Sequence, residues 1–562
     1  MQTFPTQQSS FTRCLSQFFA KILIRRRLIR LHKDLTRRSF LSTLVMPAVC
    51  LIVLGTLAVS ARAQMVDNTQ AINPINAGIN KSLTQEIGTG RGNVNIPDSS
   101  LFIINRDAFR AVRRGRQLFQ RKFTRVQGQG PGVDDGVGNI ATTKEIGAGL
   151  ADSCAACHGR PRGSAGVGGD VVTRPDSRSA PHLFGLGLKE MLADEMTSDM
   201  RAIRTKAVTS AKQIGKSVTL PLLTKGVSFG SITGNPDGSI DTSQVQGVNP
   251  DLRVRPFFAQ GGTISMREFI VGALNAEMGL QAVDPDLAAA SAGGRVITPS
   301  GMVLDGSRDA IEAPPAPDPV NGNEIDPALV DHLEFYLLNY FKPGISQQDP
   351  SANHGSKVFD QLGCATCHVE NLTVNHDRRV ADLNTVYDPV NGIFNRMFAT
   401  ATALIHKVND NSGYPPLMVP NGQPFVVQDI YTDFKRHDLG PNFHERNWDG
   451  TIQTEFLTRP LWGVGSLGSL GHDGRSINLT EVILRHGGEA QASRDAFANL
   501  FSQGNEGDAF DLLHFLGTLV LFPPDDTASN LDPGNRAAPN FPQSGHGSIK
   551  LTVLFNNPKD PE

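Results

Sequence analysis

Two copies of the motif Cys-x-x-Cys-His constrain the fold of this chain more than any other feature. They read Cys154-Ala-Ala-Cys157-His158 and Cys364-Ala-Thr-Cys367-His368. This spacing is that of c-type haem attachment, in which two thiols bond to the two vinyl groups of one porphyrin and the adjacent histidine binds the iron. Zinc sites and redox disulfides also use cysteines at this spacing. The sequence predicts two covalently bound haem c groups.

The first 63 residues differ in character from the rest of the chain. A basic segment, 13–38, precedes an apolar stretch from Phe40 to Val59, and Ala61-Arg62-Ala63 follows as a cleavage pattern. This order is typical of a secretory signal, although the apolar stretch approaches the length of a retained membrane anchor. We expect cleavage and export to the periplasm or medium of a bacterial cell, with no stable membrane span afterwards. Cys14 and Cys50 lie in this leader, so the mature chain has no cysteine left for a structural disulfide.

Without its leader the chain is acidic. The leader holds 10 of the 53 Lys and Arg residues and 1 of the 55 Asp and Glu residues, which leaves 43 basic and 54 acidic residues and a formal net charge of −11. No basic surface is left that would indicate nucleic acid as a partner. The acidic balance suits docking of a basic electron donor, such as a small cytochrome or a cupredoxin, but it also serves solubility alone.

An internal repeat surrounds the two motifs. Gly115-Arg-Gln-Leu-Phe119 precedes the first motif and Gly355-Ser-Lys-Val-Phe359 precedes the second, and each unit ends in an apolar helix, at 331–341 and at 511–519. A helix, a Cys-x-x-Cys-His site, loops and a closing helix make a cytochrome c unit. The sequence therefore predicts a mainly α fold of two tandem cytochrome c-like helical domains.

The two units differ in length. Phe119 lies 35 residues before Cys154, with a glycine-rich stretch between them, whereas Phe359 lies five residues before Cys364. Long insertions around the first haem indicate a built pocket, and surface decoration is the alternative. The expected divisions are a signal peptide, an N-terminal domain with the catalytic haem, a C-terminal domain with the electron-transfer haem, and a polar tail, at 1–63, 64–345, 346–525 and 526–562.

A second axial ligand is expected for the second haem. Asn478 and Glu481 have the spacing of a capping box, and Gly487-Gly488 is a helix stop. In the helix between them, His486 shares a face with apolar residues, at spacings of three, four and seven. A histidine on such a face is often a core residue, but a haem in the same unit favours a ligand. We predict that His368 and His486 bind the second iron.

Four segments of the second unit carry a family resemblance. They are Arg436-His-Asp-Leu-Gly-Pro441, Thr454-Glu-Phe-Leu-Thr-Arg-Pro-Leu-Trp-Gly463, His472-Asp-Gly-Arg475 and Ile483-Leu-Arg-His-Gly-Gly-Glu-Ala490. Together with the two motifs, they make the chain resemble the di-haem oxidoreductase family, which is related to bacterial di-haem cytochrome c peroxidases. The resemblance extends over roughly residues 105 to 522.

The resemblance implies ligands and roles in the second unit. In the peroxidases, a methionine fourteen residues after the histidine of His-Asp-Gly binds the electron-transfer haem, and His486 occupies that position after His472. A second histidine should give a lower potential than methionine. Di-haem rubber oxygenases resemble this chain in having two histidines there. We interpret His472 itself as a structural residue.

The surroundings of the first haem are less defined. His158 is the expected proximal ligand, and His182 is the nearest following histidine, either a distal group or a packing residue. Phe257 and Phe258 could wall the pocket or fill the core. Glu190 and Glu268 could act as an acid or base, although we expect surface positions for both. With no distal ligand evident, this haem is predicted to have an open position for peroxide or dioxygen.

The resemblance implies a peroxidase-like oxidoreductase. Electrons from a donor would enter at the C-terminal haem and reduce hydrogen peroxide at the N-terminal haem. A dioxygen-dependent oxygenase acting on an apolar substrate and a non-enzymatic electron carrier remain as alternatives. The peroxidases place a tryptophan between the haems, whereas Trp448 and Trp462 both lie in the second unit. The sequence therefore does not indicate the route of electrons between the haems. The peroxidases also bind calcium between their domains. Calcium is possible here as well, but the expected ligands are absent from residues 466–471.

Overall fold

The structure is a computed structural model, and it describes residues 87–121, 153–158, 180–278, 280–316, 325–339, 344–345, 348–387, 397–447 and 449–520. Every described residue belongs to one compact unit, Ile72–Glu562. The signal segment, the glycine-rich stretch before Cys154, Trp448 and the tail lie outside the described residues. Among the helices within them, none is long and apolar enough to cross a membrane.

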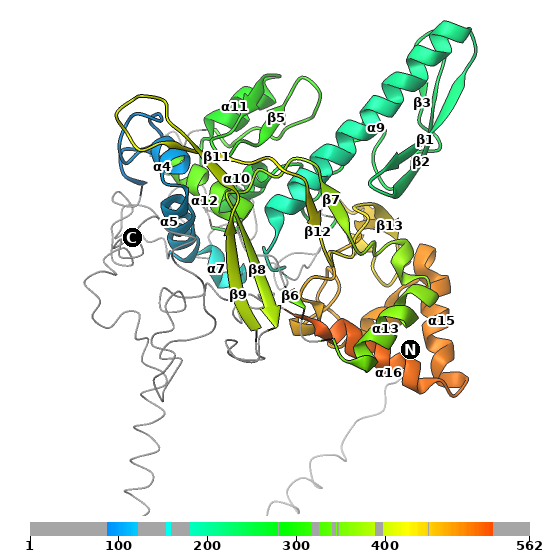
Figure 1. Cartoon of the computed structure of the whole chain (residues 1–562). Coiled ribbons are helices and arrows are strands. Elements are labelled where there is room, and N and C mark those ends of the chain that lie inside the picture. The colour runs from blue at the N-terminus through cyan, green and yellow to red at the C-terminus, as the bar shows by residue number, and fades with distance from the viewer. Residues whose placement is uncertain are drawn as a thin grey trace, which may run out of the picture. The chain divides into compact units, whose positions relative to one another are not determined.

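The helix before the first motif crosses the closing helix of the first unit closely. The repeat glycine Gly115 lies on α5 (Ala108–Gln120), and α12 (Pro327–Asn339) is the predicted closing helix (Figure 1). A Cβ on Gly115 would stand 2.2 Å from the backbone oxygen of His332. Only glycine permits such an approach, so the first copy of the repeat marks a helix crossing. A short helix, α4 (Ser100–Arg106), precedes α5 and is capped by the Ser99 hydroxyl.

The second copy of the repeat forms the same kind of crossing. Gly355 lies on α13 (Pro350–Gln361), and a Cβ there would stand 1.9 Å from the backbone oxygen of Asp511 on α16 (Glu506–Thr518). Two further helices, α14 (Leu479–Arg485) and α15 (Gln491–Ser502), lie before α16 in the chain. The repeat seen in the sequence therefore corresponds to a repeated helix pair.

The mainly α fold predicted from the sequence is wrong. The described residues contain one three-stranded antiparallel sheet, β1-β2-β3, and seven two-stranded sheets, so the fold mixes helices and strands. Most of the strands form hairpins or short pairs in the long segments that connect the helices. The two-stranded sheets are β4 (Arg295–Ile297) with β5 (Val303–Asp305), β6 (Gly344–Ile345) with β17 (Leu519–Val520), β7 (Leu372–Val374) with β12 (Phe425–Val427), β8 (Ala381–Tyr387) with β9 (Met397–Ala403), β10 (Ile405–Val408) with β11 (Leu417–Pro420), β13 (Arg436–Asp438) with β16 (Glu455–Leu457), and β14 (Glu445–Arg446) with β15 (Ile452–Gln453).

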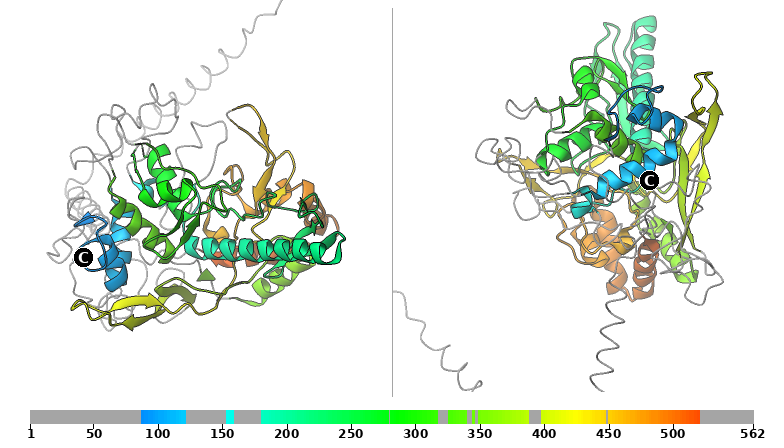
Figure 2. Two further views of the ribbon diagram at one scale, coloured as in Figure 1. Left: turned by 90° about the horizontal axis from the view of Figure 1, so that it is seen from above. Right: turned by 90° about the vertical axis from the view of Figure 1, so that its left-hand side faces the viewer.

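The largest insertion after the first motif builds an extended arm. It consists of α9 (Leu186–Ile214) and the strands β1 (Val218–Thr224), β2 (Val227–Gly234) and β3 (Ile240–Asp241), which run beside the outer part of the helix (Figures 1 and 2). A Cβ on Gly234 would stand 2.5 Å from the backbone nitrogen of Val208, so β2 lies directly against α9. The inner end of α9 is buried, which anchors the arm beside the first site.

Two apolar cores hold the two sites. The larger core takes buried side chains from both sides of residue 345, among them Leu118, Met191, Leu337, Val427 and Trp462. The smaller core belongs to the second unit and contains Val358, Phe359, Phe497 and Phe515. The domain boundary near residue 345 stays a prediction. The remaining described α-helices are α7 (Cys154–His158), α10 (Met266–Ala276) and α11 (Pro285–Ser291).

Candidate haem-binding sites

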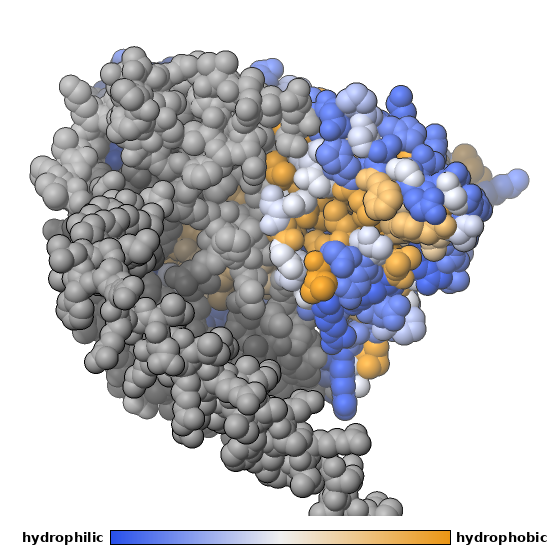
Figure 3. Space-filling view, turned by 90° about the horizontal axis from the view of Figure 1, so that it is seen from below, coloured by the Kyte–Doolittle hydropathy of each residue, from blue (hydrophilic) through white to orange (hydrophobic). Residues whose placement is uncertain are grey.

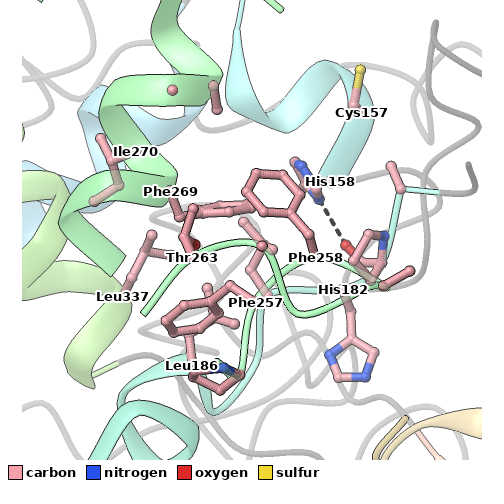
Figure 4. Close-up of a pocket in the computed structure, with 18 of the residues that line it drawn as sticks. Cys157, His158, His182, Leu186, Phe257, Phe258, Thr263, Phe269, Ile270 and Leu337 are labelled. Atoms are coloured by element: carbon pink, nitrogen blue, oxygen red, sulfur yellow. Dashed lines mark hydrogen bonds between the residues drawn. The ribbon is translucent and has the colours of Figure 1, made fainter. Parts of the chain in front are cut away.

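The first motif lies at the wall of a large cavity. Helix α7 carries Cys154, Cys157 and His158 into a space of about 620 Å³ (Figure 4). This volume falls within the range of cofactor pockets, which is about 300–1,000 Å³. The wall is mostly aromatic and aliphatic, with contributions from α5, α9, α10, α12 and the second unit, including Phe119, Leu186, Phe257, Phe258, Phe269, Leu274, Met278, Leu337 and Trp462.

The ring of His158 is held by the backbone. Its Nδ1 lies 2.7 Å from the carbonyl oxygen of Pro181, the contact drawn as a dashed line in Figure 4. With the proton on Nδ1, the ring donates to this carbonyl and Nε2 stays available for a metal. Burial lowers the pKa of His158, which favours the neutral imidazole that an iron ion requires.

His182 follows Pro181 directly, but its ring points away from His158 (Figure 4). Its Nε2 lies 2.8 Å from the backbone oxygen of Trp462, to which it donates, and its Nδ1 is buried with no hydrogen-bond partner. Burial lowers the pKa of His182 to about 3, so the ring is neutral. Because Pro181 contacts the Nδ1 edge of His158, this segment lies behind the ring and away from Nε2.

Three phenylalanines form one wall of the cavity. Phe269, on α10, has ring centroids 6.4 Å from His158, 6.1 Å from Phe257 and 5.4 Å from Phe258. Phe257 is buried, whereas Phe258 is 45% exposed and has a left-handed φ of 60°. A phenylalanine in that backbone region is uncommon. Both residues that the sequence suggested for the wall therefore line the cavity.

The two glutamates considered as an acid or base are buried, so the expected surface positions are wrong. The Glu268 carboxylate accepts from the backbone N–H of Ser265 in the capping box of α10, and also from Glu312 N–H. Glu190 accepts from the backbone N–H of Met266. Both carboxylates are therefore engaged by the start of α10. Burial raises the pKa of each.

Two cationic side chains line the described part of the cavity, Lys189 and Arg459. Lys189 is near the N-terminus of α9, with its ammonium 5.7 Å from the centre of the Phe257 ring. Burial, and then the charge of Arg459, lower the pKa of Lys189 to about 8. An apolar cavity with two cations at its wall suits a planar apolar group that carries carboxylates, as the porphyrin of haem does with its two propionates.

The second motif has the same backbone support. Cys364 and Cys367 belong to a 3-10 turn and the residue after it, and the Nδ1 of His368 lies 3.0 Å from the carbonyl oxygen of Tyr431. Burial, and to a smaller extent the neighbouring His486, lower the pKa of His368 to about 4, although the Tyr431 carbonyl opposes this. The ring is therefore neutral, with Nε2 free. The repeat residue Phe359 contacts both His368 and Tyr431, with ring centroids 6.1 and 5.7 Å away.

His486 lies at the end of α14. The cap at Asn478 forms as predicted, since its side chain accepts from the backbone N–H of Glu481, but the Glu481 carboxylate accepts from Ile477 instead of Asn478. The helix ends at Arg485, so the predicted place of His486 on a helix face is wrong, and it is the first residue after the helix. Its Nδ1 lies 2.7 Å from the Val482 carbonyl oxygen.

His486 therefore presents Nε2 in the same way as His158 and His368. Repulsion from a protonated His486 is a smaller cause of the lowered pKa of His368, after burial. Burial lowers the pKa of His486 itself. The ring of Phe443 packs against it at 5.2 Å, nearly perpendicular. The pairing of His486 with His368 at one iron stays a prediction.

His472 is part of the scaffold of this site. It is buried, its ring stacks on Phe456 at 3.9 Å, and its Nε2 lies 2.9 Å from a carboxylate oxygen of Glu445. The neighbouring Asp473 binds the guanidinium of Arg485 at 2.5 Å, which fixes the C-terminal end of α14 next to His486. The His-Asp-Gly segment therefore acts on the site through the positions of its neighbours.

A buried charged group beside the second motif was not recognised from the sequence. His437 lies between Asp433 at 2.9 Å and Glu489 at 2.8 Å. The ligand atoms of Cys367, Asp433 and His437 lie within 4.8 Å of one another. Burial lowers the pKa of His437, but the Asp433 and Cys367 hydrogen bonds outweigh it and raise the pKa to about 11. A thioether at Cys367 would remove its part of this effect.

The first thiol of each motif is a poor nucleophile as it stands. Burial raises the pKa of Cys154 to about 12 and that of Cys364 to about 11. Reactive or redox-active cysteines have the opposite shift, because they work as thiolates. Cys154 also lies against the thioether sulfur of Met278, at 4.0 Å. The surroundings suit thiols that are capped as thioethers better than a redox disulfide or a zinc thiolate site.

The comparison with protein families gives one match, at residues 392–519, to the family described as "Di-haem oxidoreductase, putative peroxidase". The segment contains all four sequence stretches that carried the resemblance, including His472 and His486. The match confirms the resemblance to the di-haem oxidoreductases over this segment, and its extension back to about residue 105 stays a prediction. Both Cys-x-x-Cys-His motifs lie before this segment. The family implies haem cofactors and an oxidoreductase, which is the class of enzyme that the match supports.

The other comparisons add little. No curated protein matches the chain. A solved hydrazine synthase of Kuenenia stuttgartiensis is 14% identical over 35% of this chain and 56% of its own, with a TM-score of 0.20. The chain thus spans little more than half of that protein's length, and a likeness this weak supports no conclusion about fold or function.

Proposed function

We propose that this di-haem oxidoreductase is an exported, peroxidase-like enzyme with two covalently attached haems c, in which electrons from a donor pass through the C-terminal haem to hydrogen peroxide at the N-terminal haem. The proposal rests on a difference between the two sites in the number of histidines available as iron ligands. The second offers a pair of histidines with free Nε2 atoms, His368 and His486. Of the described histidines that line the first cavity, only His158 has a free Nε2, because the Nε2 of His182 donates to a backbone carbonyl.

The residues give each site its task. When bound, haem supplies a redox-active iron with up to two axial positions. His368 and His486 would fill both positions at the second site, which suits electron transfer without substrate binding. His158 would fill one position at the first site and leave the other toward the cavity. The carbonyls that accept from Nδ1 fix each ring, and such partners also raise ligand basicity.

Peroxide turnover by the loaded protein tests the proposal. We expect the purified holoprotein to contain one high-spin and one low-spin haem, and to oxidise a reduced donor when hydrogen peroxide is added. The variant His158→Ala should alter the high-spin signal and abolish the turnover, because the iron would lose its imidazole, whereas His406→Ala, on the exposed hairpin β10–β11, should change neither. Absence of peroxide-dependent oxidation in a protein that contains both haems would reject the peroxidase.

A dioxygen-dependent oxygenase is the second candidate, and the apolar cavity wall favours it. Phe257, Phe258 and Phe269 line the space beside His158, and the carboxylate of Glu268 is occupied by backbone N–H groups. Peroxide cleavage profits from a proton shuttle, whereas a dry pocket suits dioxygen and an apolar substrate. Transfer of labelled oxygen from dioxygen into an apolar product would support this candidate, and a peroxide-only reaction would reject it.

The surface of the second unit suits a basic electron donor. Figure 3 shows apolar side chains on the face seen from below, the side on which α13, α15 and α16 lie in Figure 1. Within 477–520, exposed apolar residues alternate with six acidic and only two basic residues. Apolar contacts with an acidic surround favour a basic partner, such as a small cytochrome or a cupredoxin. The exposed apolar residues are Ile477, Leu484, Phe501 and Phe510.

Location completes the proposal. Haem attachment through two thioethers and the leader at 1–63 both fit a protein that matures in the bacterial periplasm. N-terminal sequencing of the mature protein should begin after Ala63. A mature chain that retains residues 40–59 would instead be held at the membrane by its leader.

A further inference from the structure

His182 lies where the two sites approach each other. Its Nε2 donates to the backbone oxygen of Trp462, a residue of the second unit whose side chain is buried in the wall of the first cavity. The indole packs on Gly185, where a Cβ would stand 2.4 Å from the ring, and its N–H donates to the Gln428 carbonyl at 3.3 Å. Trp462 thus belongs to the second unit by sequence and to the first site by position.

The first half of a continuous path runs from His158 to Trp462. The Nδ1 of His158 donates to the carbonyl of Pro181, at 2.7 Å. The peptide bond leads directly to His182, whose Nε2 donates to the carbonyl of Trp462, at 2.8 Å. Two hydrogen bonds and two adjacent residues therefore connect the proximal imidazole of the first site to the second unit.

The second half runs from Trp462 to the other proximal imidazole. The backbone N–H of Leu461, one residue back along the chain, donates to the carbonyl of Ile430 at 3.2 Å. The next residue, Tyr431, offers its carbonyl to the Nδ1 of His368 at 3.0 Å. Short covalent steps and two more hydrogen bonds thus complete the connection, with no gap across empty space.

From this connection, we infer that His182 is a positioning residue that couples the two haem sites electronically through the rear of their proximal histidines. The inference rests on the proposed function, since it needs a haem at each site. With a haem at each site, one electron would leave the second group, which would be oxidised, and reach the first, which would be reduced, along the path that these residues supply. No bond forms or breaks and no proton moves. His182 is the only side chain in the path between the two ligand rings, because every other link is backbone.

The unpaired Nδ1 of His182 separates this role from ordinary packing. A buried nitrogen without a partner costs free energy, so a purely structural position would favour an apolar residue. What the imidazole adds is the Nε2 donor at the end of a side chain of this length. Glutamine carries its amide nitrogen at a similar distance from the backbone, asparagine carries it one carbon closer, and leucine has no donor.

Three variants of the holoprotein test the inference without peroxide or donor. We propose His182→Leu, His182→Gln and His182→Asn, with rapid reduction of the second haem by a light pulse and observation of the electron reaching the first. His182→Leu should slow this transfer by about tenfold or more, the scale on which loss of a partner behind a metal ligand acts. His182→Gln should stay within about threefold of the wild type, because its N–H can still reach Trp462.

The controls distinguish coupling from folding. The resting spectra and the two reduction potentials should be unchanged in His182→Gln, and a normal two-haem spectrum in any variant shows that both sites are still built. If His182→Leu does not fold, His182→Asn against His182→Gln makes the same comparison, with the slow transfer expected for asparagine. A transfer rate in His182→Leu or His182→Asn equal to that of the wild type would overturn the inference. Transfer that is equally slow in His182→Gln and His182→Leu would also overturn it.

The proposed peroxidase is tested separately by the same samples. Transfer between the haems is measured with no oxidant present, so it can succeed in a protein that does not consume peroxide. Conversely, a protein that consumes peroxide with a transfer rate independent of residue 182 would keep the proposed function and lose this path.

Discussion

The imidazoles of His158, His368 and His486 share one arrangement, in which Nδ1 is hydrogen-bonded to a backbone carbonyl. No side chain is needed for this support, so no motif reveals it in a sequence. The histidines of the motifs and His486 could be picked out in the sequence, because spacing and family resemblance point to them, and their role as iron ligands stays a prediction. The partners Pro181, Tyr431 and Val482 could not, and neither could the direction in which His182 points.

Removal of His486 should change the spin state of one haem. In His486→Ala the second iron loses one of its two strong ligands, so its low-spin signal should convert to high-spin while the other haem keeps its own. Electron paramagnetic resonance of the resting protein measures this. His444→Ala, whose ring binds Asp438 in the same loop region, is the matched control and should leave both signals in place. An unchanged spectrum of His486→Ala would remove this residue from the site.

Asp473 should make the His-Asp-Gly loop sensitive to acid. Burial raises the pKa of this carboxyl, but the hydrogen bonds from Arg485 and from the Arg475 N–H, together with the charge of Arg485, outweigh it and hold the pKa below its usual range. A depressed pKa in the folded state means that the carboxylate stabilises the fold above its ordinary pKa of about 3.9, and that this stabilisation is lost as the pH falls through the lower value.

We therefore expect Asp473→Asn to lower the free energy of unfolding by about 2 kcal/mol at pH 7, and by progressively less below pH 4. Urea unfolding at several pH values, followed by the second haem's absorbance, measures the difference. Asp495→Asn on α15, where Arg494 is the neighbouring cation, should change little at any pH. A loss from Asp473→Asn that stayed constant down to acid pH would contradict the pairing with Arg485.

Helix pairs are the elements that the sequence predicted best. The repeat glycines and the apolar closing segments identified α5 with α12 and α13 with α16, because periodic apolar residues and caps are local signals. The strands were missed because each is short and finds its partner through a hairpin or a distant segment, as β7 does with β12. The connections around the first motif therefore gave no signal of the mixed fold.

Each helix crossing should depend on its glycine. Gly355→Ala would place a methyl group 1.9 Å from a backbone oxygen of α16, and Gly115→Ala would place one 2.2 Å from a backbone oxygen of α12. Backbone cannot move aside easily, so each change should cost about 1–3 kcal/mol of unfolding free energy. Chemical unfolding of the two variants measures it.

Gly507→Ala supplies the comparison for both. This glycine lies in the first turn of α16, where a Cβ meets nothing within 4 Å. Its replacement should be neutral or stabilise the helix by up to about 1 kcal/mol. Equal effects at positions 355 and 507 would show that the crossing does not need a glycine.

At the scale of the molecule, two similar motifs end in different surroundings. The long connections of the first unit build a cavity that extends from α9 and α10 to Trp462. The second motif instead packs against a small apolar core. The composition predicted an acidic protein, but only the structure shows which apolar and acidic side chains are exposed near the second site.

The rate at which the protein oxidises its electron donor should fall as the ionic strength rises. Interactions between exposed charges are screened beyond about 10 Å at 0.1 M ionic strength, so a basic donor should react more slowly at higher salt. Glu506→Lys, on the exposed start of α16, should slow the reaction at low salt, and Asp237→Lys, on the turn before β3 in the arm, should not. Stopped-flow oxidation of reduced donor measures both. Equal rates in the two variants would place the donor elsewhere.

The spectrum of the purified holoprotein, resting and then fully reduced, tests the central claim most directly. The account predicts two haems c per chain that stay attached after denaturation, one low-spin with two histidines and one high-spin with an open position that binds carbon monoxide once reduced. Two low-spin haems, neither of which binds carbon monoxide, would contradict it and make the protein an electron carrier.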